Sequence, residues 1–178
     1  MQTKTQKMVS TALMAALLAV LSPFVIPIGL VPITLALFAV FLTGTLLPPL
    51  YAVASIAVYL LIGFVGAPVF SGFIGGPQVL LGPTGGYLFG YFIIALAVSL
   101  SIRISKKWWV WAAGALLGLA GCYLVGTLWF MLMMHSAFLP ALTACVVPFI
   151  IPDVIKAGAA LSLGAVLNAR LGTRRNRA

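Results

Sequence analysis

The amino-acid sequence predicts an all-α integral membrane protein with six transmembrane helices. Hydrophobic residues make up 63% of the 178 residues and charged residues only 6%, and the mean hydropathy is +1.24. A soluble domain carries about a quarter charged residues, so this chain has too few of them to cover a surface that faces water. Since one helical span takes about 20 residues, the length leaves room for six spans with short connections. We therefore expect residues 1–178 to form a single membrane domain.

The first three spans are separated by proline and glycine. The first is expected at about residues 8–26 and should stop at the Pro-Ile-Gly sequence of residues 27–29, because Pro and Gly end helices. The second, at about residues 33–47, is short for a span. The adjacent prolines 48 and 49 make the turn into the third, at about residues 50–65.

The last three spans are longer. The fourth is expected at about residues 87–102 and is closed by a basic connection at residues 103–107. Trp108, Trp109 and Trp111 then open a fifth span that continues to about residue 134, and such tryptophans are typical of the membrane interface. The last apolar region, about residues 138–171, is interrupted by three prolines.

The positions of the basic residues predict the topology. The ten basic residues are Lys4, Lys7, Arg103, Lys106, Lys107, Lys156, Arg170, Arg174, Arg175 and Arg177. All but Lys156 lie at the chain ends or in one short connection. Six crossings with both termini in the cytoplasm place those nine on the inside, as the positive-inside rule requires. The net charge of +9 is therefore explained by a bacterial-type cytoplasmic membrane and not by nucleic-acid binding.

Asp153 is the only acidic residue of the chain, and Lys156 follows it by three positions within an apolar stretch. A spacing of three puts both on one helix face. A charge at the bilayer centre costs at least about 2.5 kcal/mol, so it marks function by default. If the last helix starts at Pro152, the pair lies in its outer half. The alternative is a purely structural ion pair, which gives no reason for introducing two charges.

The connection between the third and fourth spans, residues 66–86, reads GAPVFSGFIGGPQVLLGPTGG. It lies outside in the predicted topology, yet it is too hydrophobic for a water-exposed loop. We expect it to fold back onto the helices, where non-helical backbone is tolerated if it lines a cavity. It forms either a plug that caps the bundle or the wall of an external ligand site. Gln78 and Thr84 are its polar candidates, and Tyr87 follows it.

The first span carries two pairs of small residues at a spacing of four, Ala12 with Ala16 and Ala15 with Ala19. Small residues at this spacing let another helix approach closely. Internal packing and a partner surface explain the pattern equally well.

No catalytic constellation is visible. The chain has one Asp, one His and no phosphate-binding loop of the form GxxxxGK[ST], so we expect neither an enzyme nor ATP hydrolysis by this chain alone. Cys122 and Cys145 lie in apolar stretches and are expected to be packing residues. We expect no metal and no cofactor. The residues predict an outward-facing, mostly apolar pocket that is lined by one acid, one amine, an amide and aromatic side chains. Such a pocket suits a small amphipathic molecule with hydrogen-bonding groups.

Two strings carry a family resemblance. The loop GAPVFSGFIGGPQVLLGPTGGYLFGY (residues 66–91) and the later PDVIKA (residues 152–157) closely resemble the BioY family, the biotin-specific substrate-binding (S) components of energy-coupling-factor (ECF) transporters. The resemblance spans essentially the whole chain in length, six-helix layout and motif order.

The resemblance implies a biotin-binding site and a partner surface. Asp153 would accept from the ureido N–H groups of biotin, and Lys156 would donate to the ureido carbonyl or to the valerate carboxylate. Further contacts would come from Gln78, Tyr87, Thr84, Phe70 and Phe73. Such proteins dock on a transmembrane coupling protein with two cytoplasmic ATPases, which makes Ala12 and Ala16, with Ala15 and Ala19 as alternates, interface candidates.

Three alternatives stay open at this point. The chain could be an S component for another vitamin, against which the loop string argues. It could be a solitary biotin facilitator that works without ATPases. It could also be a structural or assembly factor of the membrane, for which an intramembrane Asp–Lys pair has no evident use.

Overall fold

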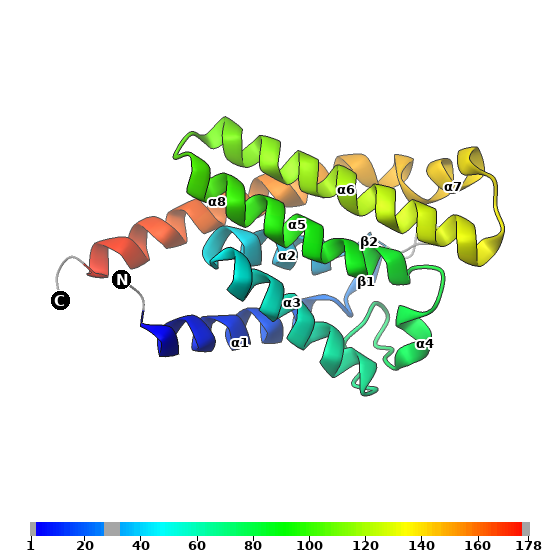
Figure 1. The fold of residues 1–178 in the computed structure, drawn as a ribbon, viewed down its shortest axis with the longest axis horizontal. Helices are drawn as coiled ribbons and strands as arrows, with labels where there is room; N and C mark the ends of the chain where they lie inside the picture. Colours follow the sequence, from blue (N-terminus) through cyan, green and yellow to red (C-terminus); the bar gives the residue numbers. More distant parts are fainter. Residues whose placement is uncertain (1–2, 27–32, 176–178) are drawn as a thin grey trace.

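The computed structural model describes residues 3–26 and 33–175, and side chains as far as residue 170. The described chain is mostly helical (Figure 1). Its elements are α1 (Lys4–Leu21), β1 (Val25–Ile26), β2 (Ile33–Thr34), α2 (Ala36–Leu46), α3 (Pro49–Phe64), α4 (Pro77–Leu80), α5 (Gly85–Ile104), α6 (Trp108–Met134), α7 (Phe138–Cys145), the 3₁₀ turn η1 (Val147–Phe149) and α8 (Ile150–Arg175).

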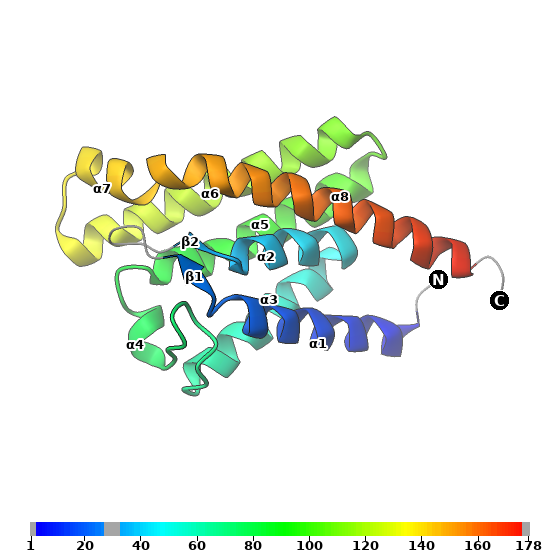
Figure 2. The same ribbon diagram turned by 180° about the vertical axis from the view of Figure 1, so that it is seen from behind.

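The helices form an elongated bundle with two distinct ends, which Figures 1 and 2 show from opposite sides. The start of α1, the end of α8, the α2–α3 turn and the α5–α6 connection lie at one end. The β1–β2 pair, the segment around α4 and the α6–α7 connection lie at the other. The basic connection and the described chain ends are thus gathered at the same end of the bundle.

Three helical segments of the described residues are long and apolar enough to cross a membrane, namely α5, α6 and the run Phe138–Arg170, which contains α7 and most of α8. Helices α2 and α3 are apolar but shorter. Large apolar side chains stand exposed on the outside of the bundle, among them Leu117 and Leu132. Such a surface suits lipid, and the protein is an integral membrane protein.

Close contact between α5 and α6 rests on glycine. A Cβ on Gly118 of α6 would lie 2.9 Å from Cα of Ile94 on α5. A Cβ on Gly126 would lie 2.3 Å from the ring of Tyr87. Real Cβ atoms do not come this close, so both positions require glycine if the two helices are to keep this distance.

The first span differs from its predicted bounds. Instead of residues 8–26, α1 covers Lys4–Leu21. It starts early because Thr3 and Gln6 form a capping box, in which each side chain bonds the backbone N–H of the other. It ends before Pro23, since a proline disfavours helix in the residue ahead of it, and Val25–Ile26 pair with Ile33–Thr34 as antiparallel strands. The predicted turn at residues 27–29 lies outside the described residues, as does Arg177.

The last span was predicted as one interrupted segment, and the structure shows the breaks. After α7 and η1 the final helix begins at Ile150, two residues before Pro152. Pro152 therefore stands in the first turn of α8, where a missing N–H leaves no intrahelical bond unmade. The fifth span is confirmed at its predicted bounds, Trp108–Met134.

Candidate functional site

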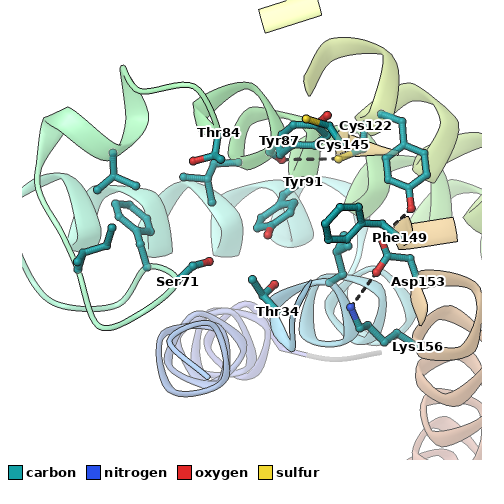
Figure 3. A pocket seen from close by; sticks show the side chains of 16 residues that line it. Thr34, Ser71, Thr84, Tyr87, Tyr91, Cys122, Cys145, Phe149, Asp153 and Lys156 are labelled. Atoms are coloured by element: carbon teal, nitrogen blue, oxygen red, sulfur yellow. Dashed lines mark hydrogen bonds and ion pairs between the residues drawn. The ribbon is translucent and has the colours of Figure 1, made fainter. Parts of the chain in front are cut away.

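A cavity of about 250 Å³ lies in the half of the bundle that contains α4 and the β1–β2 pair. Its apolar lining consists of Leu37, Phe70, Ile74, Val79, Leu88 and Phe149. Its polar and sulfur-containing lining consists of Thr34, Ser71, Thr84, Tyr87, Tyr91, Cys122, Tyr123, Cys145, Asp153 and Lys156. Figure 3 shows Asp153 and Lys156 on one side of this space, with Ser71 and Thr84 across from them. The lining thus combines aliphatic and aromatic side chains with converging polar groups, as small-molecule sites do.

An ion pair forms one wall of the cavity. Nζ of Lys156 donates to Oδ1 of Asp153 at 2.8 Å. The Asp153 side chain is 1% exposed, whereas that of Lys156 is 12% exposed. The second carboxylate oxygen of Asp153 accepts from the hydroxyl of Tyr123 at 2.7 Å. Both oxygens of Asp153 therefore have a donor from the protein, and within the described part of the chain the lysine keeps two N–H donors for other partners.

The start of α8 explains why this acid is tolerated in an apolar region. Asp153 stands in the first turn of the helix, where the helix dipole and free backbone N–H groups favour negative charge. Lys156, three positions on, lies on the same face. The pair therefore has local support from the helix in addition to the bond from Tyr123.

The α5–α6 side of the cavity is built around Tyr87. Its hydroxyl lies 3.1 Å from Oγ1 of Thr127, and its backbone carbonyl accepts a long bond from Sγ of Cys122 at 3.6 Å. Tyr91 follows one turn later on the same face and is also part of the lining. These contacts fix the ring of Tyr87 against the glycine at position 126.

The loop wall is anchored to the helices by aromatic residues. Phe70 is 1% exposed and meets Tyr59 edge to face, with centroids 5.6 Å apart. The Tyr59 hydroxyl lies 2.6 Å from Oγ of Ser22 and donates to the Val69 carbonyl at 3.2 Å. On the α6 side, Nε1 of Trp129 donates to the carbonyl of residue 82 at 2.9 Å. The loop thus folds back onto the bundle at both of its halves.

Five of the predicted binding residues line this one cavity: Asp153, Lys156, Tyr87, Phe70 and Thr84. The structure does not bring the other two to the lining. Gln78 is exposed and donates to the Gly75 carbonyl at 2.7 Å. Phe73 is 60% exposed and meets Phe24 edge to face at 5.6 Å.

The reason for this difference lies in the local backbone of the loop. Residues 77–80 form the short helix α4, which begins at Pro77. Phe73 has a φ of 60°, a left-handed conformation that turns the chain between Phe70 and Ile74. Composition shows that this loop is too apolar for water, but it does not show which of its aromatic residues points inward.

Several lining residues were missed by the sequence reasoning. Tyr91 lies four positions after Tyr87, a helical spacing that would have found it. Cys122 and Cys145 were expected to be packing residues; both are buried, and both also border the cavity. Tyr123 comes from α6, 30 residues before Asp153, and no sequence pattern links the two.

The four alanines of α1 separate into two groups. Ala12 and Ala16 are exposed. Ala15 is 1% exposed within the core, and Ala19 is partly buried against it. The small-residue pattern therefore serves internal packing on one side of the helix and leaves a shallow surface on the other.

Comparison with known proteins gives three concordant matches. The model of the BioY family matches residues 1–173. "Biotin transporter BioY2" of Lactococcus lactis is 39% identical over 160 residues, which cover 87% of this chain and 86% of that protein. "Biotin transporter BioY" of Thermotoga maritima is 36% identical over 85% of this chain and 89% of that protein.

A solved structure matches the fold. The crystal structure of an S-component for biotin from an ECF-type ABC transporter superposes with a TM-score of 0.85. The sequence identity is 29%, and the match covers 95% of each chain.

Proposed function

The chain belongs to the BioY family, and on that premise we propose that it is the biotin-binding membrane component of an ECF-type vitamin uptake transporter. The observation that carries this function is the cavity walled by Asp153 and Lys156 in a chain whose fold matches a biotin S-component over 95% of its length. The protein captures biotin at the outer face of the cell membrane and delivers it with energy from partner ATPases.

The chemistry of the cavity suits biotin. Biotin combines an apolar thiophane ring and valerate chain with a polar ureido group and a carboxylate. Phe70, Val79 and Phe149 provide apolar contact, and Lys156 provides a cation that uses one of its three N–H donors among the described residues. Tyr87 and Thr84 add polar groups across the chamber. The volume of about 250 Å³ is close to the lower end of ligand pockets, about 300 Å³, and suits a small ligand.

Binding by Gln78 and Phe73 stays a prediction. In the described arrangement neither side chain lines the cavity, so we propose a site built on the five residues that do. The loop backbone between them would have to change for Gln78 or Phe73 to reach the ligand.

We propose six crossings with both termini in the cytoplasm. The gathering of the basic connection and the described chain ends at one end of the bundle supports this topology. Helix α2, at 11 residues, rises only about 16 Å, so this crossing would be completed by the extended residues of β2. The segment of residues 66–86 is then the external loop, and residues 1–178 form one membrane domain.

The partner is proposed to be a coupling protein that carries two ATPases. The exposed pair Ala12 and Ala16 offers a close-packing surface for a helix of that protein. Ala15 and Ala19 are engaged inside the bundle, which supports the first pair over the second.

Uptake measurements test the function and separate it from its alternatives. Cells that neither make nor import biotin would express this chain with an ECF module whose ATPases are either active or inactivated by substitution. We expect uptake of labelled biotin with active ATPases only, and no competition by excess riboflavin or thiamine. Uptake that is independent of the ATPases would indicate a solitary facilitator. Competition by another vitamin would indicate an S component for that vitamin.

A further inference from the structure

Tyr123 makes a contact that the binding chemistry above does not use. It reaches from α6 to the acid on α8, and its hydroxyl donates to Oδ2 of Asp153 at 2.7 Å. Lys156 donates to the other oxygen, Oδ1, at 2.8 Å. The carboxylate is 1% exposed, so these two donors replace most of the hydration that it would have in water.

The hydrogen bond from Tyr123 fixes which carboxylate oxygen of Asp153 faces Lys156. The terminal torsion of an Asp side chain is soft and nearly two-fold, so a carboxylate held by one partner can turn and exchange its oxygens. A bond from Tyr123 to Oδ2 removes this freedom and leaves Oδ1 to Lys156. Since Lys156 spends one N–H on Oδ1, its two remaining donors acquire a fixed direction.

We propose that Tyr123 is a positioning residue that orients Lys156 through Asp153 for contact with an acceptor group of the ligand. The proposal rests on the proposed function. It adds to that function a role for Tyr123 and an orientation for the N–H donors of Lys156. Each oxygen of Asp153 already accepts one bond from the protein, whereas Lys156 uses only one of its three N–H donors among the described residues. Lys156 is therefore the group of this wall that donates to the ligand. The ligand group that they meet is an acceptor, either the valerate carboxylate or the ureido carbonyl.

Two analogues of biotin separate positioning from a merely structural role. Biotinol replaces the carboxylate by an alcohol, and 2-iminobiotin replaces the ureido carbonyl oxygen by nitrogen. If Tyr123 acts through Lys156, its hydroxyl matters less to whichever analogue has already lost the group that meets Lys156. A hydroxyl that only supports the fold affects all three ligands equally.

The experiment measures equilibrium binding of biotin and both analogues to the purified protein and to Tyr123→Phe, which removes only the hydroxyl. Tyr51→Phe is the matched control, because Tyr51 lies outside the cavity lining and contacts Lys7 through its ring. We expect Tyr123→Phe to weaken biotin about tenfold or more, as a hydrogen bond to a charged group does. For one analogue the loss should shrink to less than about threefold, and Tyr51→Phe should change none of the affinities.

The outcomes that overturn the inference differ from the one that overturns the function. Equal losses for all three ligands, no loss for biotin, or failure of Tyr123→Phe to fold would each assign the hydroxyl another role and reject positioning. In those cases the unsubstituted protein still binds biotin, and the proposed function stands. If the unsubstituted protein binds no biotin, the function fails, and the positioning role fails with it.

Discussion

The rings of Tyr59 and Phe70 meet edge to face with centroids 5.6 Å apart, and this contact joins α3 to the loop that walls the cavity. Phe70 also covers the glycine at position 63, where a Cβ would lie 2.1 Å from the Phe70 ring. The Tyr59 hydroxyl continues the connection to Ser22, at the end of α1, at 2.6 Å. Two helices thus hold one wall of the proposed biotin site.

Tyr59→Phe tests this connection by removing only the hydroxyl. The buried Oγ of Ser22 and the Val69 carbonyl would both lose a partner, and an unsatisfied buried polar group costs about 1–3 kcal/mol. We expect a lower melting temperature in detergent and faster dissociation of biotin, because the loop wall is less firmly held. Tyr51→Phe is again the control. Unchanged melting temperature and dissociation rate would contradict the role assigned to this hydroxyl.

Gly63→Ala tests the packing of Phe70 more severely. The added methyl group occupies the space of the Phe70 ring, and overpacking of this kind costs about 1–3 kcal/mol. Since Phe70 lines the cavity, we expect weaker biotin binding as well as lower stability. Gly158→Ala on α8 is the matched control, because nothing lies within 4 Å of a Cβ there, and it should be neutral or stabilising. Equal behaviour of the two variants in thermal unfolding and binding would contradict the packing described.

The reactivity of the two cysteines reports whether the cavity is occupied. Cys122 and Cys145 are 2% and 1% exposed, and both border the cavity. We expect saturating biotin to slow their reaction with a small methanethiosulfonate reagent several-fold, because the ligand fills the space through which the reagent arrives. Mass spectrometry of Cys122→Ala and Cys145→Ala would follow each thiol separately. Identical rates with and without biotin would place the ligand elsewhere.

Substitutions at the exposed alanines of α1 should impair transport without impairing biotin binding. Phe at Ala12 or Ala16 would fill the shallow surface proposed for the coupling protein, without reaching the cavity. We expect Ala12→Phe and Ala16→Phe to keep biotin affinity within about twofold but to lose co-purification with an ECF module and uptake. Leu117→Phe, at an exposed position of α6, should lose neither. Normal assembly of both alanine variants would show that the partner docks at another surface.

The helices of this protein can be predicted from the sequence more completely than the residues of its candidate site. Helix α6 could be placed at both ends because a run of tryptophans opens an uninterrupted apolar stretch. The start of α1 could not be predicted in this way, because its polar first turn is stabilised by the capping box of Thr3 and Gln6 and not by hydrophobic residues. The extended pair of residues 25–26 and 33–34 depends on contact between two segments and has no periodic signature of its own.

Some residues of the candidate site can be predicted from the sequence, and others cannot. Asp153 and Lys156 stand out because charge is rare in an apolar chain, and the structure places both at one cavity. Phe70 and Phe73 are the same residue type in the same apolar loop, so the sequence does not distinguish them. The turn between them buries Phe70 and leaves Phe73 exposed. Tyr123 could not be found from sequence, because its hydrogen bond to Asp153 comes from the packing of α6 against α8.

Equilibrium binding of labelled biotin to the purified protein, compared with Lys156→Met, tests the central claim most directly. Methionine keeps the length and apolar stem of the side chain while it removes the ammonium. The account predicts saturable one-to-one binding that is weakened about tenfold or more in the variant, because a hydrogen bond from a charged donor contributes about 1.5–3 kcal/mol. Absence of biotin binding by the folded protein, or equal affinity of the protein and Lys156→Met, would contradict it.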